Sequence, residues 1–288
     1  MNKVYLHKNI TLNKILIYFF SSIFLLIIYG TYKNGILLYQ KHLISFLGLL
    51  KPLYLFLFPF LIFYIYNVLI KKNSKINFDY FYWACLGLFM PPQINLVLYS
   101  VLIIVLIFLL QYIPLKINKQ VFSKLLIILV LIIINKYTYF NLLETSVVYS
   151  FSSFDLLWGR SIGGICSTSF VFTLICYFIL ISSGYYKGEI PFISFIVYFA
   201  LVIIFHYLFG SYLYLNNSNI LLALVIYGSN NEFTPFLPKL RVFYSILLGL
   251  LTFIFTLITN NFEGVFIAIL ILSCLTPYFE NKLFKLNI

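Results

Sequence analysis

The stretch LLWGRSIGGICSTSFVF, Leu156–Phe172, leads a cluster of glycine and hydroxyl residues into an apolar run that ends near residue 184. A run of about 20 apolar residues is long enough to cross the hydrocarbon core of a bilayer as a helix. The whole chain has this character: 63% of its 288 residues are hydrophobic, 9% are charged, and the mean hydropathy is +1.04. A soluble protein of this size could not bury so much apolar surface, so we predict an all-α polytopic membrane protein whose solvent is the lipid bilayer.

Apolar runs predict about ten transmembrane helices in a single integral membrane domain, residues 1–288, with halves at 1–140 and 141–288. The spans are placed at 15–31, 50–70, 80–95, 96–113, 123–140, 162–184, 191–210, 218–233, 241–259 and 263–279. With the N-terminus inside, 14 of the 19 Lys and Arg residues lie on the inner side and 5 outside. This bias predicts an even number of spans with both termini cytoplasmic, in a bacterial cytoplasmic (inner) membrane. The external segment 32–49 is expected to lie along the interface as a short amphipathic helix.

The formal charge of +12 comes from basic residues in short loops between apolar runs, so it orients the helices and predicts no nucleic-acid partner. Four cysteines are spread along the apolar runs without metal-ligand spacing: Cys85, Cys166, Cys176 and Cys274. We therefore predict no metal site and structural thiols. No Ser–His–Asp set or phosphate-binding loop is visible, so the sequence indicates no catalytic residue and no hydrolytic enzyme.

Two apolar segments are interrupted by prolines. GLFMPPQINLVLY (Gly87–Tyr99) contains Pro91 and Pro92, and YGSNNEFTPFLPKLRVFY (Tyr227–Tyr244) contains Pro235 and Pro238. Broken helices at membrane depth are tolerated where protein or a cavity satisfies the freed backbone groups. Because each segment is the third element of a five-span half, the pair predicts a five-plus-five inverted repeat with a central site. The alternative is a tight external hairpin and an ordinary inner loop.

The glycine-rich stretch resembles the segment L-F-x-G-N-x-x-G-S-x-G-E-T-S of one membrane family. That family comprises the D subunit of the Rnf electron-transport complex and the B subunit of the sodium-pumping NADH:quinone reductase. The matching residues are Leu156, Gly159, Gly163, Thr168 and Ser169. Arg160, Gly164, Cys166 and Ser167 replace the family's Asn, Ser, last Gly and Glu.

Three further segments resemble the same family. The signature P-E-G-V-x-F-A-I-L with N-x-x-T-P is similar to NFEGVFIAILILSCLTP through Glu263, Gly264, Val265, Ala268, Ile269, Leu270, Thr276 and Pro277. The family's T-G-L-L-L-A-L-x-L-P-P segment is matched by Gly87, Leu88, Pro91 and Pro92. A-T-D-P-V-T-S-P followed by G-I-L-x-G-L-L-T is matched by Ala223, Pro235, Gly249, Leu250, Leu251 and Thr252. The resemblance covers nearly the whole chain and implies a ten-span inverted repeat.

The chain departs from the family where cofactors bind. Members with covalent FMN attach it through the Thr of an external S-G-A-T motif, and the corresponding loop, NLLETSVVYSFSSFD, lacks that motif. The Asp of A-T-D-P and the stretch G-x-G-x-N-x-F-N-P-A are missing as well. We therefore predict no covalent FMN and, through the resemblance, a noncovalent flavin (riboflavin or FMN).

The candidate cofactor-binding residues are Gly163, Gly164, Thr168, Ser169, Arg160 and Glu263. First-turn amides and hydroxyls can hold a flavin or quinone, but the spacing Gly163-x-x-x-Ser167 equally predicts close helix packing. Glu263 either handles protons or cations or caps the last helix. Arg160 either positions phosphate or lipid headgroups or snorkels to the interface. In this arrangement Thr168 and Ser169 face a central cavity bordered by Pro91 and Pro235.

Two functions remain open. The resemblance implies a membrane subunit of a flavin-dependent electron-transport complex that passes electrons across the membrane, with ion coupling and with other membrane subunits as partners. The alternative is a small-solute transporter, for example of a flavin-related compound, or a channel-like protein on the same scaffold.

Overall fold

The computed structural model describes residues 12–70, 79–112, 153–159, 163–184, 186–210, 217–230, 234–235 and 237–286, and these ranges contain helices and connecting turns. The predicted span 123–140 lies outside them. The helices are α1 (Leu12–Thr31), η1 (Tyr32–Ile36), α2 (Leu37–Gln40), α3 (Phe46–Leu49), α4 (Lys51–Leu69), α5 (Asp79–Ala84), η2 (Cys85–Phe89), α6 (Leu96–Tyr112), α8 (Ser153–Trp158), α9 (Phe170–Ser182), α10 (Glu189–Phe209), α11 (Asn217–Ala223), η5 (Leu224–Gly228), α12 (Pro238–Thr259) and α13 (Gly264–Leu286).

Several of these helices have the length and composition of transmembrane segments. In the described ranges the long apolar helices are Lys14–Gln40, Lys51–Leu69, Glu189–Phe209 and Pro238–Thr259. The shorter apolar helices are Leu96–Phe108, Phe170–Ser182, Asn217–Gly228 and Gly264–Thr276. Large apolar side chains cover their outer faces; on α10, for example, Ile204 is 55% exposed. Such a surface suits lipid, which agrees with the predicted all-α membrane class.

The first span is longer than predicted. The helix passes from α1 through the π-helical turn η1 into α2, so it ends at Gln40, nine residues beyond the predicted end at residue 31. One face of this extension is packed, since Leu38 is buried and Gly35 lies against the carbonyl oxygen of Leu49, whereas Tyr32 and Tyr39 are exposed. Only the short α3 remains of the predicted external amphipathic helix.

Helix α4 shows how a break inside a span is satisfied. Pro59 lies within α4 and cannot donate an amide proton to the carbonyl of Leu55, four residues earlier. The hydroxyl of Tyr99, from α6, donates to that carbonyl oxygen at 2.7 Å. Gly87 packs against the same stretch of backbone, where a Cβ atom would overlap the carbonyl of Leu55. The contacts lock α4, η2 and α6 into one packed unit.

The two proline-interrupted segments form half-helices instead of full spans. The α5–η2 helix ends at Phe89, just before the two prolines, and α11–η5 ends at Gly228. The predicted spans 80–95 and 218–233 are therefore too long, because the chain leaves the helix where proline or glycine interrupts it. The two half-helices touch: the Tyr227 hydroxyl donates to the carbonyl of Tyr82 at 3.1 Å. The Tyr227 ring also lies against Phe89 and Phe266 in the core.

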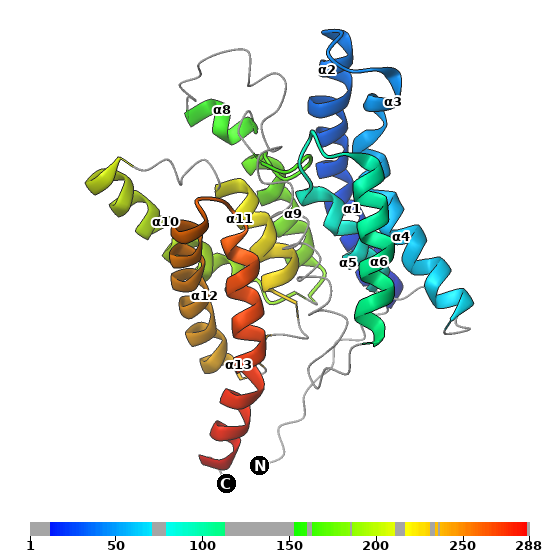
Figure 1. Ribbon diagram of the computed structural model, residues 1–288. Helices are drawn as coiled ribbons and strands as arrows, with labels where there is room; N and C mark the ends of the chain where they lie inside the picture. Colours follow the sequence, from blue (N-terminus) through cyan, green and yellow to red (C-terminus); the bar gives the residue numbers. More distant parts are fainter. Residues whose placement is uncertain are drawn as a thin grey trace.

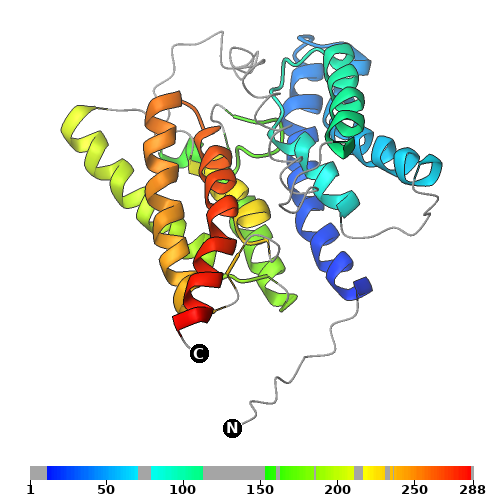
Figure 2. The ribbon, with the colours of Figure 1, turned by 60° about the horizontal axis from the view of Figure 1, so that its bottom comes forward.

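The helices form two groups that follow the chain order. Figure 2 shows α1–α6 on one side and α10–α13 on the other. Helices α10, α12 and α13 pack side by side in the second group, and α1 packs along α9 between the groups. The short helices α2, α3 and α8 lie at the same end of the molecule (Figure 1, top). This arrangement brings the glycine-rich segment between α8 and α9 against the first group.

Candidate functional site

The described part of the glycine-rich segment, residues 163–169, is not helical. Helix α9 begins only at Phe170, and Ser169 caps it by accepting a hydrogen bond from the amide of Phe172 at 3.4 Å. The predicted span 162–184 therefore starts too early. Because Gly163 and Ser167 are not on a helix, the predicted small-xxx-small helix contact is wrong, and the small residues need another explanation.

The explanation is a backbone contact with the first broken segment. The amide of Ile165 donates to the carbonyl of Met90 at 2.7 Å, and the amide of Cys166 donates to the carbonyl of Leu88 at 3.2 Å. The end of η2 and the segment 163–169 thus satisfy one another's backbone groups inside the protein. Non-helical backbone is tolerated at membrane depth only where such partners exist.

Asn219, in the first turn of α11, completes this contact. Its Oδ1 atom accepts a hydrogen bond from the amide of Gly164 at 3.2 Å and another from the Ser167 hydroxyl at 2.6 Å. Asn219 is fully buried, and so is Ser167. We call the set Leu88–Met90, Gly164–Ser167 and Asn219 the central junction. It joins three segments that lie far apart in the sequence.

The two glycines of the segment are small because protein occupies the space beside them. A Cβ atom at Gly164 would lie 2.7 Å from both the carbonyl oxygen of Leu88 and the Cα atom of Phe89. A Cβ atom at Gly163 would overlap the side-chain amide of Asn219. The glycines therefore allow a close approach, but a loop makes it against the backbone of Leu88 and Phe89 and the side chain of Asn219, not a helix against a facing helix.

Two further polar residues of the site come from η1, and the sequence reasoning missed them. The Lys33 ammonium donates to the carbonyl of Gly159 at 2.7 Å and to the Thr168 hydroxyl at 3.4 Å. The Asn34 amide donates to the carbonyl of Ile165 at 2.6 Å. Both side chains are buried, with 6% and 4% exposure. The sequence carried no signal for this, because a Lys–Asn pair before apolar residues is equally typical of an exposed loop, where Lys33 was expected.

The other predicted site residues lie elsewhere or outside the described ranges. Arg160 falls outside them, and so does Thr145, the threonine nearest to the expected flavin-attachment context. Glu263 is 4% exposed and directly precedes α13, and its Oε2 atom accepts a hydrogen bond from the side-chain amide (Nδ2) of Asn261 at 3.5 Å. A carboxylate beside a helix N-terminus stabilises the positive end of the helix dipole, and this interpretation stays a prediction beside the role in handling protons or cations.

The two broken segments border different pockets. Pro92 lines a partly open pocket of about 310 Å³ beside α2 and α3, whereas Pro235 lines a pocket of about 10 Å³ between α12 and α13. Thr168 and Ser169 line neither of these pockets. Neither pocket brings the two broken segments together, and a cavity that Thr168, Ser169, Pro91 and Pro235 share stays a prediction. Among the described residues, the first broken segment, the glycine-rich segment and α11 meet at the central junction.

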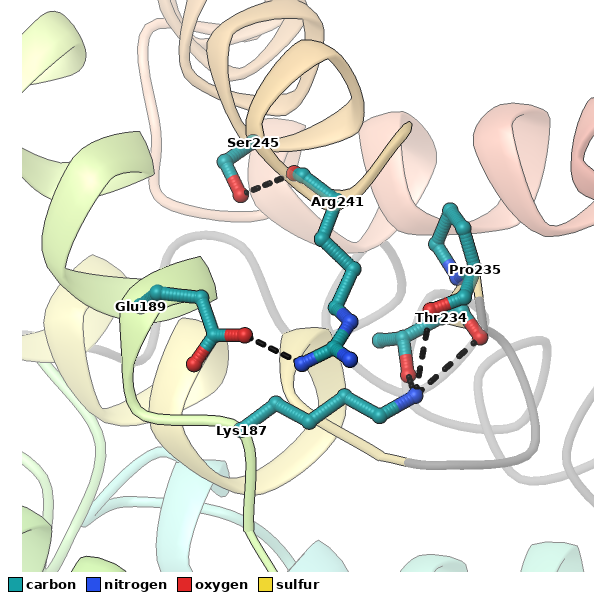
Figure 3. A network of polar contacts seen from close by, with 6 residues as sticks. All are labelled: Lys187, Glu189, Thr234, Pro235, Arg241 and Ser245. Carbon is teal, nitrogen blue, oxygen red and sulfur yellow. Dashed lines mark hydrogen bonds and ion pairs between the residues drawn. The ribbon is translucent and has the colours of Figure 1, made fainter. Parts of the chain in front are cut away.

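A second polar cluster stabilises the backbone around Pro235 (Figure 3). The Lys187 ammonium donates to the Thr234 hydroxyl at 2.9 Å and to the carbonyl of Pro235 at 3.2 Å. Beside it, Arg241 in the first turn of α12 pairs with Glu189 in the first turn of α10. These contacts satisfy carbonyl groups in the irregular backbone between η5 and α12 and tie the starts of two long helices together.

A flavin does not fit against the inner side of the glycine-rich segment. Gly163 and Gly164 face protein atoms, so no cradle is left beside them. The hydroxyls of Thr168 and Ser169 are engaged by Lys33 and by the first turn of α9, and both residues are buried. Of the predicted site residues, Gly164 belongs to the central junction, and Gly163, Thr168 and Ser169 lie directly beside it and are occupied by protein contacts.

Taken together, apolar helices, two half-helices and a buried backbone junction define an integral membrane protein with interrupted helices. The chain belongs to the NQR2, RnfD, RnfE family, whose model matches residues 1–287. It is therefore a membrane subunit of an Rnf/Nqr-type complex. No curated protein matches the chain.

Proposed function

We propose that this protein is an electron-carrying membrane subunit of an Rnf/Nqr-type complex, with electron passage coupled to ion movement. The observation that carries the proposal is the match to the family model over residues 1–287. The partners would be the other membrane subunits of that complex, and the site of action the bacterial cytoplasmic membrane with both chain termini on its cytoplasmic side.

The helix order supports an inverted repeat as the scaffold for this function. In the first part of the chain, two helices, α1 and α4, are followed by the half-helix α5–η2 and then by another helix, α6. The same order returns as α9, α10, α11–η5 and α12, and the first members, α1 and α9, pack together. Paired half-helices at matching positions are typical of membrane proteins that move ions or solutes past a central site.

The proposal includes a noncovalent flavin, because the S-G-A-T attachment motif is missing from the sequence. A bound flavin would supply one- and two-electron redox chemistry, and the protein would bind it, orient it and tune its potential. The central junction has no space for it at Gly163 and Gly164, so the flavin would contact the protein at another surface.

The test is the visible spectrum of the purified full-length protein, isolated in mild detergent from flavin-replete cells. We expect oxidised-flavin absorbance that bleaches on reduction with dithionite. After denaturation and ultrafiltration, the chromophore should pass into the filtrate while the protein stays colourless. A protein that is colourless as purified, alone and with its partner subunits, would refute the flavin-dependent function.

A further inference from the structure

The pocket of about 310 Å³ beside α2 and α3 has the features of a built site. Its lining residues are Asn34, Leu38, Ile44, Ser45, Gly48, Lys51, Pro92 and Gln93. They come from the extended first helix, the α2–α3 turn, the start of α4 and the proline segment after η2. The volume lies at the lower end of the range for small-molecule sites, so the pocket can take a headgroup or a single ring system.

The charge of the pocket is one-sided. Lys51 is half-buried, and its side chain makes no hydrogen bond or ion pair with any residue that the structure describes. None of the described lining residues is acidic. Lys51 is also the first residue of α4, whose first turn holds no acidic residue, so the positive end of the helix dipole adds to the ammonium charge. A half-buried cation without a protein partner favours an anionic ligand.

The rim of the pocket is strongly apolar. In the short helix α3, Phe46 is 63% exposed and Leu47 is 75% exposed, and the flanking residues Leu43 and Leu50 are 45% and 42% exposed. These four residues are chain neighbours of Ser45 and Gly48, which line the pocket, and they do not line it themselves. A free anion in water would gain nothing from such a rim, whereas an amphiphile would cover it with its hydrocarbon part.

We propose that this pocket binds the phosphate headgroup of an anionic phospholipid. Lys51 pairs with the phosphate, and the amides of Asn34 and Gln93 face the polar part of the headgroup. The acyl chains run over Phe46 and Leu47. Because Asn34 also donates to the carbonyl of Ile165, a bound lipid stabilises the side chain that supports the central junction. The proposal is independent of flavin binding.

The experiment measures thermal unfolding of the full-length protein in detergent with added phosphatidylglycerol, phosphatidylcholine or inorganic phosphate. We expect phosphatidylglycerol to raise the unfolding temperature saturably, with little effect of the other two. Lys51→Gln should weaken the apparent phosphatidylglycerol affinity about tenfold, the loss expected for one hydrogen bond to a charged group. The matched control is Lys41→Gln. Lys41 is exposed in the turn between α2 and α3 and does not line the pocket, so this variant should behave like the wild type.

A second variant tests the apolar rim without touching the core. Phe46→Ser with Leu47→Ser changes two exposed side chains, so it should fold normally and still bind phosphatidylglycerol less tightly. Equal stabilisation by phosphatidylcholine, or an unchanged phosphatidylglycerol affinity in Lys51→Gln, would overturn the proposal. Equal stabilisation by inorganic phosphate would replace the lipid by a free anion. Stabilisation by riboflavin that Lys51→Gln abolishes, with no response to phosphatidylglycerol, would assign the pocket to the flavin instead.

Discussion

Replacing Asn219 with alanine should weaken the protein more than its small loss of volume suggests. Oδ1 of Asn219 accepts hydrogen bonds from the Gly164 amide and the Ser167 hydroxyl, and all three residues are buried in the central junction. Asn219→Ala leaves both donors without an acceptor at a site shielded from water. An orphaned buried donor costs about 1–3 kcal/mol, so we expect about 2–6 kcal/mol for the pair.

The assay is thermal unfolding of purified variants in detergent, followed by loss of the monodisperse peak in size-exclusion chromatography. A domain of this size shifts its unfolding temperature by about 2–4 °C per kcal/mol, so the expected drop is at least about 4 °C. Asn217→Ala is the matched control. Asn217 lies in the same turn of α11, and its Oδ1 atom has no hydrogen-bond partner among the described residues, so this variant should stay within about 0.5 kcal/mol of wild type.

A double variant tests the physical reason. In a Ser167→Ala background one of the two donors is already absent, so adding Asn219→Ala should cost about 1–3 kcal/mol less than it does in the wild type. Additive effects, or an Asn219→Ala variant as stable as Asn217→Ala, would refute the account of Asn219 as the acceptor that holds the junction together.

Four other outcomes are expected. Gly164→Ala should destabilise the protein by about 1–3 kcal/mol, because the added Cβ atom would be packed too closely against backbone. Gly228→Ala should be tolerated, because its Cβ atom would meet side chains no closer than 3.4 Å. Equal unfolding temperatures of the two variants would contradict this explanation. Tyr99→Phe should cost about 1–3 kcal/mol, because it orphans the carbonyl that the proline in α4 leaves without a donor, while the exposed Tyr39→Phe should not. A periplasmic reporter fused to the C-terminus should be inactive, and an active one would overturn the topology. Denaturing gels should show no flavin fluorescence even with the flavin-attaching enzyme co-expressed; a fluorescent band lost in Thr145→Ala would disprove the prediction.

The family relationship could be recognised from the sequence because the family's motifs are short and continuous in the chain. The motif around Glu263 and Gly264 and the proline pair Pro91–Pro92 can be recognised without any knowledge of tertiary contacts, and the family model matches the chain they belong to. Helix ends were less predictable. The prolines indicated that two spans are interrupted but not that the helices stop at Phe89 and Gly228, because an apolar composition does not mark where a helix ends inside the protein.

By itself, the sequence determined that the protein lies in a bilayer, since its apolar content leaves no other solvent. It also determined that the segment around Gly163 and Gly164 needs small side chains. Only the tertiary structure decided what those glycines meet: the backbone of Leu88 and the amide of Asn219, in place of a facing helix or a flavin. The physical reason is that a glycine in the sequence shows only that a side chain is absent at that position; it does not show which group occupies the space. The group that fills this space comes from residues about 75 positions earlier and 55 positions later in the chain, and no local pattern encodes their approach.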